Sequence, residues 1–192
     1  MIVIEILDTH SVELFSTHNL HAQPERLFTM PEESYYESGA HHIPAAAGTV
    51  KWMSGDIYNL KLTAQESNGS LSFIHAVVPP GNGPVAHIHK ENDEAFYLLE
   101  GELEFLDGEK TFTASAGDFV FVPRGVRHRF KNLTSAEVKM VFLFTPAGQE
   151  EFALRFGDDP LPGHAPELWG PERFTPEMLE VVERLGNLNA PE

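Results

Sequence analysis

The spacing of histidine, glutamate and glycine over residues 81–101 constrains the fold of this chain more than any other feature. This stretch begins at Gly81, carries His87 and His89 two residues apart, continues to Glu94 and ends at Gly101. Side chains two residues apart on a β-strand leave the same face, so an extended 87–89 segment points both imidazoles in one direction. The polar residues 90–93 predict a turn, after which 94–99 forms a new strand. We expect that strand to lie antiparallel beside the first and to bring Glu94 to the two imidazoles.

A second punctuated stretch follows over residues 117–132. It begins at Gly117, carries Pro123 and Gly125 two residues apart, reaches His128 and ends at Asn132. Proline and glycine at this spacing favour a tight turn, which delivers the third imidazole from another hairpin. Three imidazoles and one carboxylate, in a chain without cysteine, are ligands typical of a divalent transition metal.

Both stretches resemble the two motifs of the cupin family. The first reads glycine, five residues, His-x-His, four residues, glutamate, six residues, glycine; the second reads glycine, five residues, Pro-x-Gly, two residues, histidine, three residues, asparagine. No defined position departs from either motif. The resemblance implies a jelly-roll β-barrel and identifies His87, His89, Glu94 and His128 as the metal ligands, with one divalent metal ion per chain.

The chain pattern agrees with an all-β fold. Hydrophobic and polar residues alternate over 58–65, Asn68-Gly69 predicts a hairpin to 71–78, and Asp107-Gly108 predicts another between 102–106 and 109–113. Further strands are expected over 118–122, 127–131 and 137–145. We therefore predict one cupin domain over residues 1–192: an irregular N-terminal arm (1–48), a β-barrel core (about 49–146) and a C-terminal helical tail (147–192).

The tail carries two helix signals. Phe152 and Phe156 lie four residues apart on one face of a helix expected over 149–156. Thr175 and Pro176 are typical of an N-cap and a first helical position, and Gly186 is a stop signal.

The charge composition indicates which classes of partner the chain is expected to bind. The 192-residue chain has 29 acidic and 13 basic residues, a net charge of −16 that repels nucleic acid and anionic membranes. No basic leader or membrane-length apolar run is present, so we expect a cytoplasmic protein. We also expect a homodimer, because single-domain cupins commonly pair their barrels, with the Ile88 face and the terminal helices as surfaces.

The segment 144–157, with its Pro/Gly turn leading into a phenylalanine-containing acidic helix, is similar to the end of quercetin 2,3-dioxygenase-like cupins. That resemblance implies an oxidoreductase that cleaves a flavonol or another small enolisable aromatic with O2. It makes Glu94 a candidate catalytic base as well as a ligand. Phe96 and Leu98 share the strand face of Glu94, and Phe130 shares that of His128, so we expect these three to line the substrate pocket; ordinary barrel core is the competing interpretation.

Two other functions fit the same ligands. One is a non-oxidative cupin enzyme (isomerase, cyclase or lyase) that needs its metal only as a Lewis acid. The other is a non-catalytic small-molecule-binding cupin. The ligand set favours iron, nickel or manganese for oxygen chemistry and also accepts zinc, cobalt or copper.

Overall fold

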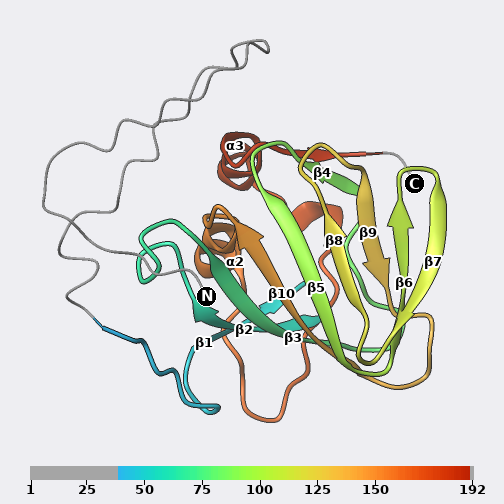
Figure 1. Cartoon of the computed structure of the whole chain (residues 1–192), viewed down its shortest axis with the longest axis horizontal. Coiled ribbons are helices and arrows are strands. Elements are labelled where there is room, and N and C mark those ends of the chain that lie inside the picture. The colour runs from blue at the N-terminus through green and yellow to red at the C-terminus, as the bar shows by residue number, and fades with distance from the viewer. Residues whose placement is uncertain (1–38, 191–192) are drawn as a thin grey trace, which may run out of the picture.

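Two facing antiparallel β-sheets form the body of the protein (Figure 1), in a computed structural model that describes residues 39–190. The larger sheet has six strands, in the order β1 (Thr49–Met53), β2 (Asp56–Leu62), β3 (Ser72–Val78), β10 (Val138–Thr145), β5 (Asp93–Glu100) and β8 (Phe119–Val122). The smaller has five, in the order β11 (Asn187–Asn189), β4 (His87–His89), β9 (His128–Lys131), β6 (Glu102–Asp107) and β7 (Lys110–Ser115).

From β3 to β10 the chain passes repeatedly between the two sheets, which confirms the predicted all-β jelly roll. The inner faces pack together through alternating apolar residues. In β10, for example, Val138, Met140, Phe142 and Phe144 are all buried, while the residues between them are only partly buried. Burying such a side chain contributes about 1.5–3 kcal/mol relative to leaving it exposed, so this alternation selects which face of each strand turns inward.

The predicted hairpins are present. β2 pairs with β3, and β6 pairs with β7 across a turn in which Gly108 has φ 61°. Asn68 and Gly69 both have positive φ, as a tight turn requires, but they lie within a wider connection over residues 63–71. The hairpin signal therefore predicted the strand pairing correctly and the loop length less well.

The expected pairing of the two ligand-bearing strands is wrong. β4 lies between β11 and β9, whereas β5 lies between β10 and β8 in the other sheet. The short connection after His89 crosses between the sheets, because β5 pairs with β10 and β8 and buries Glu94, Phe96 and Leu98 on its inner face. Glu94 consequently reaches the histidines across the interior and not from a neighbouring strand.

The tail has both predicted helices, α2 (Glu150–Phe156) and α3 (Pro176–Arg184), with a 3-10 turn at Pro171–Arg173. The Thr175 hydroxyl accepts a hydrogen bond from the Met178 backbone N–H, as expected of an N-cap. The strand β11 was not predicted. It begins directly after Gly186 and pairs with β4, so the tail joins the sheet that carries the histidines.

Most of the predicted N-terminal arm lies outside the described residues. Among the residues that the structure describes, no helix is long and apolar enough to cross a membrane. The cytoplasmic location stays a prediction.

Candidate metal centre

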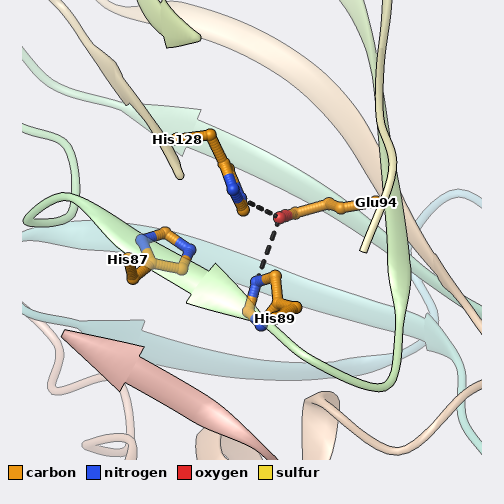
Figure 2. Close-up of side chains that lie close together, drawn as sticks. All are labelled: His87, His89, Glu94 and His128. Atoms are coloured by element: carbon orange, nitrogen blue, oxygen red, sulfur yellow. Dashed lines mark hydrogen bonds and ion pairs between the residues drawn. The ribbon is translucent and has the colours of Figure 1, made fainter. Parts of the chain in front are cut away.

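The four predicted ligands converge inside the barrel. His87 and His89 come from β4, His128 from β9 and Glu94 from β5, and one potential ligand atom from each lies within 4.8 Å of the others. Figure 2 shows His128 and His89 flanking the Glu94 carboxylate, with His87 beside them. Ligands about 2.1 Å from a shared ion lie at most about 4.2 Å apart, so small inward movements of these side chains suffice to enclose one.

The other motif residues hold these strands in place. Gly125, with φ 86°, closes the turn before His128 and donates its N–H to the His89 carbonyl at 2.7 Å. Gly83, at one of the undefined positions within the first motif, lies so close to β9 that a Cβ there would be 2.2 Å from the Phe130 carbonyl oxygen. The fully buried Asn132 side chain donates to two backbone carbonyls and accepts from Thr134. The motif therefore encodes the approach of strands as well as the ligands.

Each imidazole is anchored through Nδ1. The Nδ1 atoms of His87 and His128 lie 2.8 and 2.9 Å from the backbone carbonyl oxygen two residues earlier. Nδ1 of His89 lies 2.6 Å from Oδ1 of Asn187 on β11. Because these oxygens only accept, each Nδ1 carries the proton and donates, which leaves Nε2 for the interior of the cluster.

The Glu94 carboxylate bridges two of the imidazoles. Its Oε2 lies 2.8 Å from Nε2 of His128, in a hydrogen bond, and 3.2 Å from Nε2 of His89. The second contact lacks hydrogen-bond geometry, so the buried His89 Nε2 has no hydrogen-bond partner within residues 39–190. An unpartnered buried nitrogen aimed at a carboxylate and two imidazoles fits a divalent transition metal.

The protonation states suit ligation. Burial, followed by the neighbouring His128 and His89, lowers the pKa of His87 to about 4, so this ring is neutral near pH 7. Burial alone would raise the pKa of Glu94, but the interactions with His128 and His89 outweigh it and lower the pKa to about 2. Burial opposes a charge on His128, yet the hydrogen bond to Glu94 raises its pKa. The hydrogen bond between Glu94 and His128 thus joins two of the side chains that a metal ion would hold together.

A cavity of about 230 Å³ opens beside the cluster. His87, His89 and Glu94 contribute to its wall, and most of the rest is apolar. The aromatic part of the lining comes from the two sheets and consists of Tyr58, Phe96, Phe130, Phe142 and Phe144. The tail supplies a further part, which includes Phe152, Phe174 and Val182. The arrangement can hold a small, largely apolar molecule against a metal ion.

Two of the three predicted pocket residues, Phe96 and Phe130, lie in this lining. Leu98 does not: it is fully buried in the core and absent from the cavity wall. The reason is its position on β5, two residues beyond Phe96, where its backbone bonds to Asp118 and Gly117 at the far end of the strand. Whether Phe96 and Phe130 contact a substrate stays a prediction.

Tyr58 is a polar side chain that β2 contributes to the cavity wall. Burial, followed by the negative charges of Asp56 and Glu94, raises the pKa of Tyr58 well above its usual value. Burial also raises the pKa of Asp56 to about 7, despite side-chain hydrogen bonds with Asn82 and Tyr58. Sequence reasoning did not single out Tyr58 or Asp56 as site residues, although their i, i+2 spacing on β2 puts both on one strand face.

The fold and the four converging ligands define the class, and a family model described as "Cupin domain" matches residues 74–144. The chain therefore belongs to the cupin superfamily. Among solved structures, a predicted oxalate decarboxylase from Thermotoga maritima matches with a TM-score of 0.52 and 21% identity, covering 55% of this chain and 99% of that one. At that identity the likeness concerns the fold alone.

Three curated relatives bear on the chemistry. Polyketide synthase CurC of Streptomyces cyaneus is 40% identical over 95 residues, which are 48% of this chain and 60% of CurC. The tetracenomycin polyketide synthase protein TcmJ of Streptomyces glaucescens is 27% identical over 105 residues, 54% of this chain and 70% of TcmJ. Quercetin 2,3-dioxygenase of Aspergillus japonicus is 26% identical over 124 residues, 61% of this chain but 34% of that enzyme. The quercetinase resemblance is thus one distant similarity beside polyketide synthase proteins.

Replacing one ligand should empty the site. We predict that the purified protein binds about one divalent ion per chain and that His87→Ala lowers its affinity by more than the 10–100-fold typical of losing an outer hydrogen-bond partner. Metal analysis after dialysis, together with titration of the metal-free protein, measures both quantities. His75→Ala is the matched control, since His75 is half-buried on β3 outside the cluster. Equal metal content in both variants would contradict the ligand assignment.

Proposed function

We propose that this protein is a metal-dependent cupin enzyme that carries out a non-oxidative reaction, such as a cyclisation, on a small enolisable carbonyl compound. The observation that carries the proposal is the cluster of four potential ligands, three of which line an aromatic cavity. When bound, a divalent ion would supply Lewis-acid polarisation of carbonyl oxygens. We expect iron, nickel or manganese first, with zinc, cobalt and copper compatible with the same ligands.

The chain's own side chains can complete such a reaction without an oxidant. The Glu94 carboxylate is the candidate base that removes a proton from the carbon between two carbonyl groups. The resulting enolate carbon forms a bond with a second carbonyl carbon, and that carbonyl oxygen takes up a proton. Tyr58 is the candidate proton donor, because its raised pKa keeps the phenol protonated, and Asp56 can reprotonate it. After product release, proton exchange with solvent takes the proton from Glu94 and restores the one that Asp56 has given.

The apolar wall supports this assignment by excluding water from the enolate. It also limits the substrate, since about 230 Å³ is slightly below the usual 300–1,000 Å³ range of ligand pockets. A compact ring system or a short dicarbonyl chain fits better than a large flexible molecule.

The similarities favour this function over ring cleavage. Two of the relatives are named as polyketide synthase proteins, and polyketide chains are rich in enolisable carbonyl groups. The dioxygenase remains the second candidate because of the similarity to quercetin 2,3-dioxygenase, which uses a small enolisable aromatic and O2. Both candidates use the same ligands and cavity, so the requirement for oxygen discriminates between them.

Turnover should not need oxygen. We predict that protein loaded with a defined metal converts members of a panel of aryl 1,3-diketones and short poly-β-carbonyl compounds at the same rate with and without O2. Product absorbance and an oxygen electrode measure the two quantities on the same sample, with the His87→Ala variant as the metal-poor control. Conversion of a flavonol or diketone that consumes one O2 per molecule, and stops anaerobically, would establish the dioxygenase instead. Reversible binding without product under both conditions would indicate a binding protein.

Removing the phenol hydroxyl tests the proton donor. We predict that Tyr58→Phe lowers kcat by about 10²-fold, as expected for loss of a positioned general acid, while KM and metal content change little. Steady-state kinetics with the best substrate from the panel, combined with metal analysis, provides the readout. An unchanged kcat would show that Tyr58 only shapes the cavity.

We also propose that two copies associate through β8. This strand is an edge of the larger sheet within the described residues, and with β5 it exposes one apolar face formed by Tyr97, Leu99, Phe119 and Phe121. A free strand edge beside exposed aromatic side chains can pair with an identical edge about a twofold axis. The Ile88 face and the terminal helices expected from the sequence stay the alternative surfaces; the edge of β4 beside Ile88 is paired with β11.

Charge on this face should separate the copies. We predict that the double variant Phe119→Lys, Phe121→Lys sediments as a monomer at concentrations where the unchanged protein is a dimer. Analytical ultracentrifugation measures the masses, and Leu133→Lys, an exposed apolar residue in the loop after β9, is the control. A dimer that survives the double substitution would place the interface elsewhere.

A further inference from the structure

Three side-chain amides form a continuous hydrogen-bonded series that ends at a ligand of the candidate metal centre. Asn92 donates to the Pro146 carbonyl oxygen at 2.6 Å, and its own Oδ1 accepts from Gln149 Nε2 at 2.8 Å. Gln149 Oε1 accepts from Asn187 Nδ2 at 2.8 Å, and Asn187 Oδ1 lies 2.6 Å from Nδ1 of His89. Every amide in the series therefore donates toward Pro146 and accepts from the His89 side.

We propose that this amide relay (Asn92, Gln149 and Asn187) holds His89 in the Nδ1–H tautomer and so keeps its Nε2 lone pair free for the metal. The inference rests on the proposed metal-dependent function for its consequence, but the tautomer itself is a property of the metal-free chain. These three residues are positioning residues, since only Asn187 touches a ligand and none belongs to the ligand cluster.

Backbone carbonyls set the direction of the relay. The Pro146 oxygen can only accept, so Asn92 must present its NH2 group there and its oxygen to Gln149. The Gln149 NH2 group is fixed a second time, because it also donates to the Leu185 carbonyl at 3.0 Å. The carbonyl oxygens of Pro146 and Leu185 thus fix the Gln149 amide, which presents its oxygen to Asn187. Asn187 must direct its NH2 group to that oxygen, so its own oxygen faces the imidazole.

Burial makes the orientation costly to reverse. Asn92 is 5% exposed and Gln149 is 7% exposed, so a flipped amide would face a carbonyl oxygen without water to replace the lost bond. The alternative His89 tautomer would carry its proton on Nε2, next to the Glu94 carboxylate 3.2 Å away, and would block ligation. The relay therefore opposes a hydrogen bond that would otherwise be attractive in the metal-free protein.

The relay also explains why His89 differs from the other two imidazoles. His87 and His128 take their anchors from their own backbone, two residues away. His89 takes its anchor from β11 and, through Gln149, from the start of α2. The orientation of this one ligand thus depends on the C-terminal segment being docked.

Two substitutions at Asn187 separate the relay from simple packing. Asn187→Leu removes the acceptor, and we expect 15N NMR of the metal-free protein to show His89 shifting from the Nδ1–H tautomer toward Nε2–H. Titration with Zn(II) and with Mn(II) should then show affinity 10–100-fold below that of the unchanged protein. Asn187→Asp keeps an acceptor for the imidazole and should restore the Nδ1–H tautomer, although it loses the hydrogen bond to Gln149 Oε1. Its metal affinity should therefore lie above that of Asn187→Leu.

The controls distinguish failure of the relay from failure of the metal site. Leu188→Ala alters an exposed neighbour on β11 and should change neither the tautomer nor the affinity. Gln149→Met leaves Asn187 in place but removes its orienting partner, and should reduce the Nδ1–H population in part. An unchanged His89 tautomer in Asn187→Leu overturns the relay whether or not metal binds. Absence of metal binding by the unchanged protein, with the tautomer shift intact, overturns only the metal-dependent function.

Discussion

The contact between Glu94 and the histidines across the barrel interior is the interaction on which the site depends. One carboxylate oxygen on the larger sheet lies 2.8 and 3.2 Å from two imidazoles on the smaller sheet. Glu94 is 4% exposed and His128 is 2% exposed, so neither has water as an alternative partner. Removing one member of such a buried pair leaves an uncompensated charge and typically costs about 3–5 kcal/mol. The same contact therefore links the two sheets at the site and sets the separation of these three side chains.

The sequence predicted the local part of this arrangement well. Spacing alone puts His87 and His89 on one strand face, and the strands that carry all four ligands lie within one residue of their predicted bounds. It did not predict that β4 and β5 belong to different sheets, because strand partners are chosen by burial over the whole core. Leu98 lies on the predicted inner face of β5 but does not line the cavity. Alternation predicts the face on which a side chain lies, but not its position along the strand relative to the cavity.

The elements that the sequence did not predict lie mainly in the tail. The Asn187-Leu188-Asn189 alternation is a period-two signal, but three residues are too few to predict a strand without knowledge of its partner. Gln149 and Asn92 are equally hard to detect: each is an ordinary loop or cap residue in sequence. Their role arises only when residues more than fifty positions apart come together, as in the hydrogen bond between them.

The two motifs and the tail contribute different parts of the site, and this difference bears on how one ligand set can support different reactions. The motif residues supply three imidazoles, a carboxylate and the strand contacts that hold them. The tail supplies Phe152 and Phe174 to the cavity and Asn187 to the back of His89. Part of the cavity wall and the contact behind one predicted ligand therefore come from a segment outside the two motifs. Chemistry can diverge through changes in the tail while the ligand spacing stays fixed, which is why the four ligands alone do not choose between Lewis-acid catalysis and oxygen insertion.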